Sequence, residues 1–142
     1  MDSLVVRTTE FLEQQYKKPL HTVAAGLETS SGHVYFGTNI DHFSGYVCAE
    51  TSVLAMAMNA DETQFSRIVA VHKELEEVAV VNPCGKCRQI FYDYTPGITA
   101  LLNTGSDPIE QIIEELLPYG FTRQREKIQA AVSNENTGEV VG

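Results

Sequence analysis

The three cysteines of this chain lie in two short segments that are far apart in the sequence. The first segment reads C-A-E at residues 48–50, and the second reads P-C-G-K-C-R-Q at residues 83–89. A structural zinc site is closed by four protein ligands, so three thiolates leave one position open for water. Glu50 is then placed to move protons for that water. We therefore predict that the fold brings Cys48, Cys84 and Cys87 together as metal ligands beside a catalytic Glu50.

Two other interpretations explain the cysteines less completely. A C-x-x-C pair is common in redox proteins and in structural zinc sites. A redox pair would explain neither Cys48 nor Glu50. A zinc-stabilised binding module without catalysis would need a fourth ligand, taken from one of the histidines His21, His33, His42 and His72. The presence of Glu50 and the lack of a fourth cysteine favour the catalytic interpretation.

The expected site carries an excess of negative charge. Three thiolates and one Zn²⁺ sum to one negative charge, which makes the metal a weaker acid toward its water than a site with a neutral histidine. Both cysteine segments lie at predicted helix starts, where backbone N–H groups can support thiolate charge. Arg88, next to Cys87, is the candidate cation for the same support.

The overall charge argues against a nucleic-acid substrate. The chain of 142 residues has a net charge of −9 and a pI of about 4.8. Its densest basic stretch, residues 123–127, is interrupted by Gln124 and Glu126. Proteins that bind polynucleotides usually present a basic surface. A polynucleotide-editing enzyme is therefore disfavoured, and we expect a small free substrate.

Length and composition indicate one domain at residues 1–132, followed by a polar, disordered tail at residues 133–142. No apolar run approaches the ~20 residues that span a bilayer, so we expect no membrane partner. The N-terminus lacks the basic region and long apolar stretch of a signal peptide. An odd number of cysteines, two of them in C-x-x-C, fits a reducing compartment, so we expect a cytoplasmic protein.

Hydrophobic periodicity predicts alternating helices and strands. Helices are expected at residues 2–17, 47–59, 83–94, 108–117 and 122–132. Strands are expected at residues 20–27, 33–40, 65–72 and 98–102, with residues 78–81 as a short apolar approach to the second cysteine segment. This alternation implies an α/β domain with three layers, α/β/α.

Together, the two cysteine segments resemble those of the homotetrameric cytidine deaminases. Residues 39–41 (N-I-D) resemble their N-x-E nucleoside motif, and residues 117–121 (L-P-Y-G-F) resemble their L-P-x-x-F motif. Within this family the closer resemblance is to the fungal blasticidin S deaminases, in the segments at residues 42–50, 94–98 and 114–118. The resemblance covers about residues 20–121. It implies a central mixed five-stranded sheet, a homotetramer and one Zn²⁺ per chain.

The resemblance also implies the reaction, which is hydrolytic deamination at C4 of a cytosine ring. Zinc would supply an activated water, and Glu50 would take its proton, deliver it to N3 and assist the loss of ammonia. The resemblance also assigns substrate contacts. The ring of His21 and the hydroxyl of Thr22 would contact the substrate, and Asn39 and Asp41 would hold the sugar. The backbone of Ala49 would bind the base edge, Lys86 would face a carboxylate, and the ring of Phe121 would stack on the base.

The sequence departs from the nucleoside enzymes at two places. They usually have arginine after C-A-E, where this chain has Thr51, and their connection before the first cysteine is longer. The most favoured substrate is therefore blasticidin S, in antibiotic detoxification. The alternative is cytidine or deoxycytidine, in pyrimidine salvage.

Overall fold

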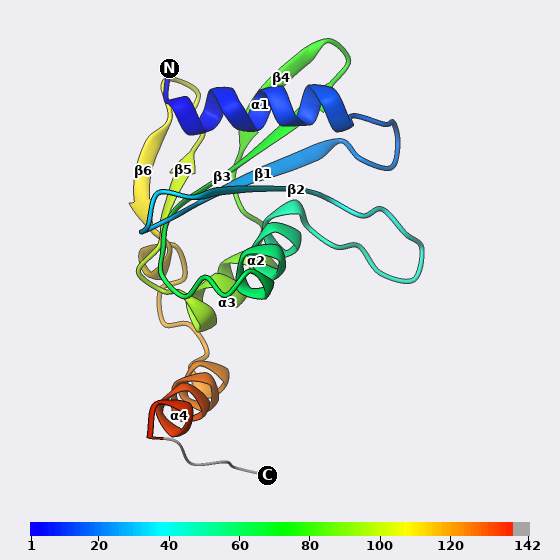
Figure 1. The fold of residues 1–142 in the computed structure, drawn as a ribbon. Helices are drawn as coiled ribbons and strands as arrows, with labels where there is room; N and C mark the ends of the chain where they lie inside the picture. Colours follow the sequence, from blue (N-terminus) through cyan, green and yellow to red (C-terminus); the bar gives the residue numbers. More distant parts are fainter. Residues whose placement is uncertain (138–142) are drawn as a thin grey trace.

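A single mixed β-sheet, with helices on both faces, forms the body of the protein. The computed structural model describes residues 1–137. Helix α1 (Ser3–Gln15) covers one face of the sheet, while α2 (Ala49–Asn59) and α3 (Gly85–Tyr94) cover the other (Figure 1). The predicted three-layer α/β/α arrangement is thus confirmed.

The strand order of the sheet is β2-β1-β3-β5-β6, and β4 pairs with β3 beside this path. Strands β3 and β5 are parallel, and the remaining pairs are antiparallel, so the sheet is mixed as predicted. The strand bounds are β1 Val23–Thr29, β2 Val34–Thr38, β3 Phe65–Glu74, β4 Glu77–Val81, β5 Thr99–Leu102 and β6 Ile109–Ile112.

The long strand β3 has three neighbours. It pairs with β1 along one edge, whereas its other edge is shared between two strands. Arg67 and Ile68 pair with β5, and residues 70–74 pair with β4. The segment that we expected to be a short approach at residues 78–81 is therefore strand β4. The sheet has six strands in the described part of the chain, where the resemblance implied five. Leu75, with a φ of 57°, and Glu76 form the tight turn that folds β4 back onto β3.

Two hydrophobic cores lie on opposite sides of the sheet. One lies under α1, and the other lies under α2 and α3. Helix α2 approaches strand β2 closely at Gly37, where a Cβ would lie 3.0 Å from the backbone nitrogen of Val53. Glycine at this position lets the helix rest directly on the strand. Since α2 begins beside Cys48, this contact helps to position the first cysteine segment.

The helix predicted at residues 108–117 is wrong. Residues 109–112 form strand β6, and a 3₁₀ helix follows at Ile113–Leu116. The isoleucine and leucine spacing in this segment fits a helix, but the exposed edge of β5 offers backbone partners from Thr99 to Leu102. Of the segment's apolar side chains, Ile113 is buried in the core, while Ile109 and Ile112 remain partly exposed. Pairing of backbone groups therefore outweighs the sequence periodicity here.

Helix α4 (Arg123–Thr137) extends away from the sheet and its helices (Figure 1). It is longer than the predicted helix at residues 122–132, and residues 133–137 of the expected tail belong to it. Residues 138–142 of that tail lie outside the described residues. Arg125 holds the start of α4, because its Nε donates to the Tyr92 carbonyl at 3.0 Å and its guanidinium lies 3.7 Å from the centre of the Tyr92 ring. In the described part of the chain, no helix is both long and apolar enough for a membrane span.

Candidate metal centre and active site

The N-termini of α2 and α3 bring the three cysteines together. Cys48 is the N-cap residue of α2, Cys84 is the N-cap residue of α3, and Cys87 lies in the first turn of α3. The three sulfur atoms lie within 4.8 Å of one another, and Cys48 Sγ is 3.6 Å from Cys84 Sγ. The two distant segments therefore meet, as the sequence predicts.

The sulfur spacing fits a tetrahedral zinc site. A Zn–S distance of about 2.3 Å at tetrahedral angles puts two sulfurs about 3.8 Å apart. Within residues 1–137, no histidine or carboxylate joins this cluster as a fourth donor. Three thiolates with one open position are the donor set of a catalytic site, whereas a closed structural site needs a fourth ligand. Cys87 is buried and Cys84 is exposed, so the cluster has an accessible side.

Glu50 lies in the first turn of α2, two residues after Cys48, and only 7% of its surface is exposed. A cavity of about 10 Å³ beside it is lined by apolar residues of the sheet, among them Ile68, Ala70 and Val81. Burial against these groups raises the pKa of Glu50 above its ordinary value, because an apolar surrounding disfavours the charged carboxylate. The carboxyl group is thus suited to both accept and release a proton.

The three thiols have different electrostatic surroundings. Burial, followed by the charge of Glu50, strongly raises the pKa of Cys87, and burial also raises the pKa of Cys48. Burial acts in the same direction on Cys84, but the backbone N–H groups of Cys87 and Lys86 help to bring its pKa below the ordinary value. This supports the expectation that a helix start stabilises thiolate charge, at Cys84 in particular.

Comparison with known proteins decides the family. The chain is 34% identical over 127 residues to a protein of Bacillus cereus named blasticidin-S deaminase, an alignment that covers 84% of this chain and 91% of that protein. The chain belongs to the cytidine deaminase superfamily. It is also 28% identical over 132 residues to a cytidine deaminase of Sporosarcina psychrophila, which covers 87% of this chain and 93% of the relative. No protein-family model matches the sequence.

Solved structures of cytidine deaminases have the same fold. The Burkholderia pseudomallei enzyme aligns with a TM-score of 0.68 and 26% identity, over 85% of this chain and 100% of that chain. The Bacillus anthracis enzyme aligns with a TM-score of 0.72 over 90% of this chain and 94% of that chain; at 23% identity, it shows the fold alone. The chain is therefore a hydrolytic deaminase of the cytidine deaminase type, in a family that generally uses zinc.

Arg88 is the site residue whose contacts differ most from expectation. Its Nε donates to the Pro83 carbonyl at 2.8 Å, and its Nη1 donates to the Leu116 carbonyl at 3.3 Å. Among the described residues, no hydrogen bond joins this guanidinium to a sulfur. Thr51 instead places its hydroxyl oxygen 3.6 Å from Cys87 Sγ. The sequence marked Thr51 only as a departure from the arginine usual in this family.

The side-chain amide of Asn39 makes three hydrogen bonds to the backbone around it. The residue is 1% exposed, and its Oδ1 accepts from the N–H groups of Thr22 and Val23, each at 3.0 Å. Its Nδ2 donates to the Leu20 carbonyl at 3.1 Å, and its own carbonyl lies 2.8 Å from His21 Nδ1. The structure thus groups His21, Thr22 and Asn39, and it gives the Asn39 amide a structural role.

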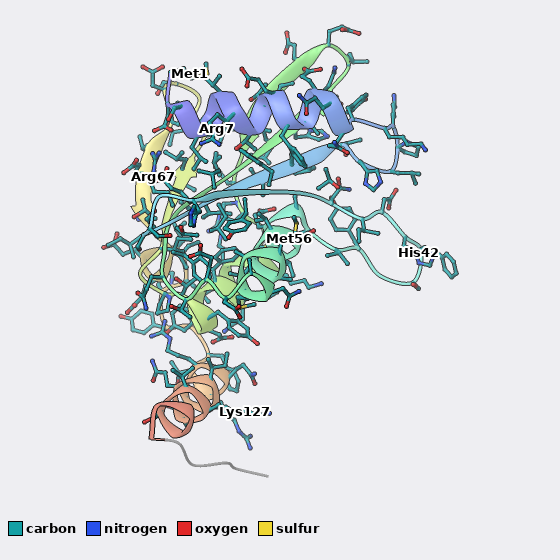
Figure 2. The ribbon with its side chains drawn as sticks, viewed as in Figure 1. Met1, Arg7, His42, Met56, Arg67 and Lys127 are labelled. Carbon is teal, nitrogen blue, oxygen red and sulfur yellow. The ribbon has the colours of Figure 1, made fainter. Side chains whose placement is uncertain are left out.

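The connection from β2 to α2 contains Tyr46, a residue that sequence reasoning did not select. Figure 2 shows His42 near the outer end of this loop. Burial raises the pKa of Tyr46, and the charges of Cys48 and Glu50 raise it further. Lys86 Nζ lies 3.5 Å from the Tyr46 carbonyl, so the loop contacts the start of α3.

The remaining predicted site residues differ in exposure. Asp41 is exposed in the same loop, and Ala49 is buried at the start of α2. Phe121 is 66% exposed, and its carbonyl accepts a 3.1 Å hydrogen bond from Gln89 Nε2. Gln89 also binds the Asp93 carboxylate, so α3 holds the backbone that carries the Phe121 ring.

Proposed function

We propose that this chain is a zinc-dependent deaminase of a free cytosine nucleoside, and that blasticidin S is its preferred substrate. The observation that carries the proposal is the cluster of three cysteine sulfurs next to the buried Glu50. Cys48, Cys84 and Cys87 would hold one Zn²⁺, whose chemistry is to lower the pKa of a water at its open position.

Glu50 performs the proton transfers in this proposal. The reaction replaces the C4–NH₂ group of cytosine by C4=O, consumes one water and releases ammonia. The carboxylate of Glu50 accepts a proton from the water, gives it to N3 of the ring, and then assists protonation of the leaving amine. Its apolar surroundings let the carboxyl group exist in both protonation states during the cycle.

The preference for blasticidin S rests on charge and on the named relative. Blasticidin S is a cytosine nucleoside whose sugar bears a carboxylate and whose amide-linked tail bears a guanidinium. Lys86, exposed between two ligand cysteines, is our candidate partner for the carboxylate. The net charge of −9 favours the cationic tail. The 34% identical relative is itself named blasticidin-S deaminase. The Asn39 amide, which would hold ribose hydroxyls in a cytidine-selective site, makes three hydrogen bonds to backbone groups.

The test compares blasticidin S and cytidine on one enzyme preparation, by the absorbance change from cytosine to uracil. We expect the higher kcat/KM for blasticidin S. Lys86→Ala should narrow the difference, mainly through KM for blasticidin S. Lys127→Ala is the matched control, because this lysine lies on α4, away from the sheet (Figure 2). Turnover of cytidine with none of blasticidin S would assign the chain to pyrimidine salvage.

We further propose that the enzyme is a homotetramer. Helix α2 presents exposed small and apolar side chains, including Ala55 and Met56. Phe121 is a further exposed ring that a neighbouring subunit would cover or use. Sedimentation measurements should show four chains per particle, and a fully active monomer would contradict this proposal. We also propose a cytoplasmic location, because an odd number of cysteines, two of them in C-x-x-C, fits a reducing compartment.

A further inference from the structure

The hydroxyl of Thr51 faces one of the ligand sulfurs. Thr51 lies in the first turn of α2, directly after Glu50, and its Oγ1 is 3.6 Å from Cys87 Sγ. Cys87 is buried. A thiolate that binds a metal has no proton to give, so in the metal-bound protein the hydroxyl is the donor of this hydrogen bond.

The backbone carbonyl to which a helical threonine usually donates has another hydrogen-bond partner here. A threonine hydroxyl within a helix often donates to the carbonyl four residues earlier. Thr8 does so in α1, with a 2.7 Å hydrogen bond to the Leu4 carbonyl. For Thr51 that carbonyl belongs to Val47, which precedes α2 and accepts the N–H of Ile40 at 2.9 Å. The position of Thr51 at the helix start therefore leaves its hydroxyl for the sulfur.

We propose that Thr51 is a positioning residue of the metal centre, which donates a hydrogen bond to the Cys87 thiolate and withdraws charge from the three-thiolate ligand set. The inference rests on the proposed zinc site at Cys48, Cys84 and Cys87. It assigns to a neutral hydroxyl the charge support that the sequence suggested for Arg88, whose guanidinium binds two carbonyls instead.

The physical effect is on the electron donation of one ligand. A hydrogen bond to a charged acceptor is stronger than one between neutral groups, especially in a buried place. Such a bond lowers the electron density that the sulfur gives to the metal, which matters most where three thiolates share one ion. Contacts of this kind orient metal ligands, and their loss typically lowers metal affinity on the order of 10- to 100-fold.

The experiment compares Thr51→Val, which keeps the branched shape and removes the hydroxyl, with Thr51→Ser, which keeps the hydroxyl. Zinc affinity is measured by chelator competition on the holoenzyme. Cobalt-substituted protein gives a second readout, because the energy of the sulfur-to-metal charge-transfer band responds to hydrogen bonding at sulfur. Ser52→Ala is the control for removing a neighbouring hydroxyl from the same helix turn.

We expect Thr51→Val to bind zinc about 10-fold more weakly and to move the charge-transfer band to lower energy. Thr51→Ser and Ser52→Ala should match the wild-type protein in both measurements. If Thr51→Val does not fold, Thr51→Ala takes its place in the same comparison. A valine variant with unchanged affinity and spectrum would overturn this inference alone, as would a serine variant as impaired as the valine variant. A wild-type protein that binds no zinc would overturn the proposed zinc function and this inference with it.

Discussion

The Nε atom of Arg88 donates a 2.8 Å hydrogen bond to the carbonyl oxygen of Pro83, the residue that precedes Cys84. The same guanidinium reaches the Leu116 carbonyl in the 3₁₀ helix. Arg88 therefore joins the entry of α3, its first turns and the segment after β6. A side chain selected for its charge next to Cys87 is placed to fix the backbone of the second cysteine segment.

Replacement of Arg88 should therefore act through geometry. We expect Arg88→Met to lower the free energy of unfolding by about 1.5–3 kcal/mol, since it leaves two partly buried carbonyls without a charged donor. Arg88→Lys keeps the charge but lacks the planar fork, so it should recover only part of the loss. Denaturant unfolding of the zinc-loaded proteins checks this. If Arg88→Lys recovered the full unfolding free energy, the positive charge, and not the planar guanidinium, would be the source of the stabilisation.

Glu50→Gln should retain zinc and fold yet lose turnover by about 10²- to 10⁴-fold, because an amide cannot carry protons between water and the ring. Ammonia release and elemental analysis on the same preparation separate the two properties. Glu10→Gln, an exposed carboxylate on α1, is the matched control. Wild-type turnover in the Glu50→Gln variant would remove Glu50 from the mechanism.

Cys84→Ala should abolish zinc binding and activity together. Wild-type protein should contain one zinc per chain, because the described residues supply one cluster of three thiols. The remaining Cys48 and Cys87 would offer two ligands, too few to hold the ion tightly. Elemental analysis after dialysis measures the change. Retention of a full zinc equivalent and activity by this variant would contradict the ligand assignment.

The loss of folding stability at acidic pH should depend on Asp2. Its hydrogen bonds to Arg67 hold the pKa of this carboxyl below the ordinary value of 3.8. A carboxyl whose pKa is lower in the folded than in the unfolded state stabilises the fold above the unfolded value, and this contribution disappears as the pH falls through the folded value.

Asp2 also caps α1 by accepting the N–H of Leu4 at 2.8 Å. Asp2→Asn keeps a capping side chain and removes the charge. This variant should be less stable at pH 7 by about 1 kcal/mol or less, a typical range for such pairs. Between about pH 5 and pH 2, its free energy of unfolding should also fall less than that of the wild type. The difference between the two falls should be on the order of the contribution of one carboxyl group. If the unfolding free energies of the two proteins fell equally with pH in this range, the role of this ion pair would be contradicted.

Gly37→Ala should test how tightly α2 is held. The added Cβ would lie 3.0–3.2 Å from backbone and side-chain atoms of Val53, so the helix must shift by a few tenths of an ångström. We expect a loss of about 1–3 kcal/mol in unfolding free energy, typical of overpacking. Gly85→Ala, at a glycine with open space around its Cβ position, is the control. Equal stability of both variants would show that the contact is loose.

The grouping of the three cysteines could be predicted from the sequence, because the type and spacing of these residues indicate a metal site. Cys48 and Cys84 precede helices whose starts the sequence indicates well, at Pro83 in particular. The strand β6 and the contacts of Asn39 were not predictable in the same way. Ile109, Ile112, Ile113 and Leu116 have helical spacing, and only the free edge of β5 makes a strand of residues 109–112. Asn39 matched a nucleoside motif, whereas its amide binds three backbone groups that lie far away in the sequence.

Strand β3 lies in the sequence between the two cysteine segments and is hydrogen-bonded along both edges at residues 70–72. Amides in such a place exchange with solvent through the largest openings of a fold rather than by local fraying. An opening of β3 would also disturb the core that it shares with α2, whose N-cap residue is Cys48. The rate of this opening, measured by the slowest hydrogen exchange in β3, should therefore set an upper limit on how long zinc bound at the proposed site is retained.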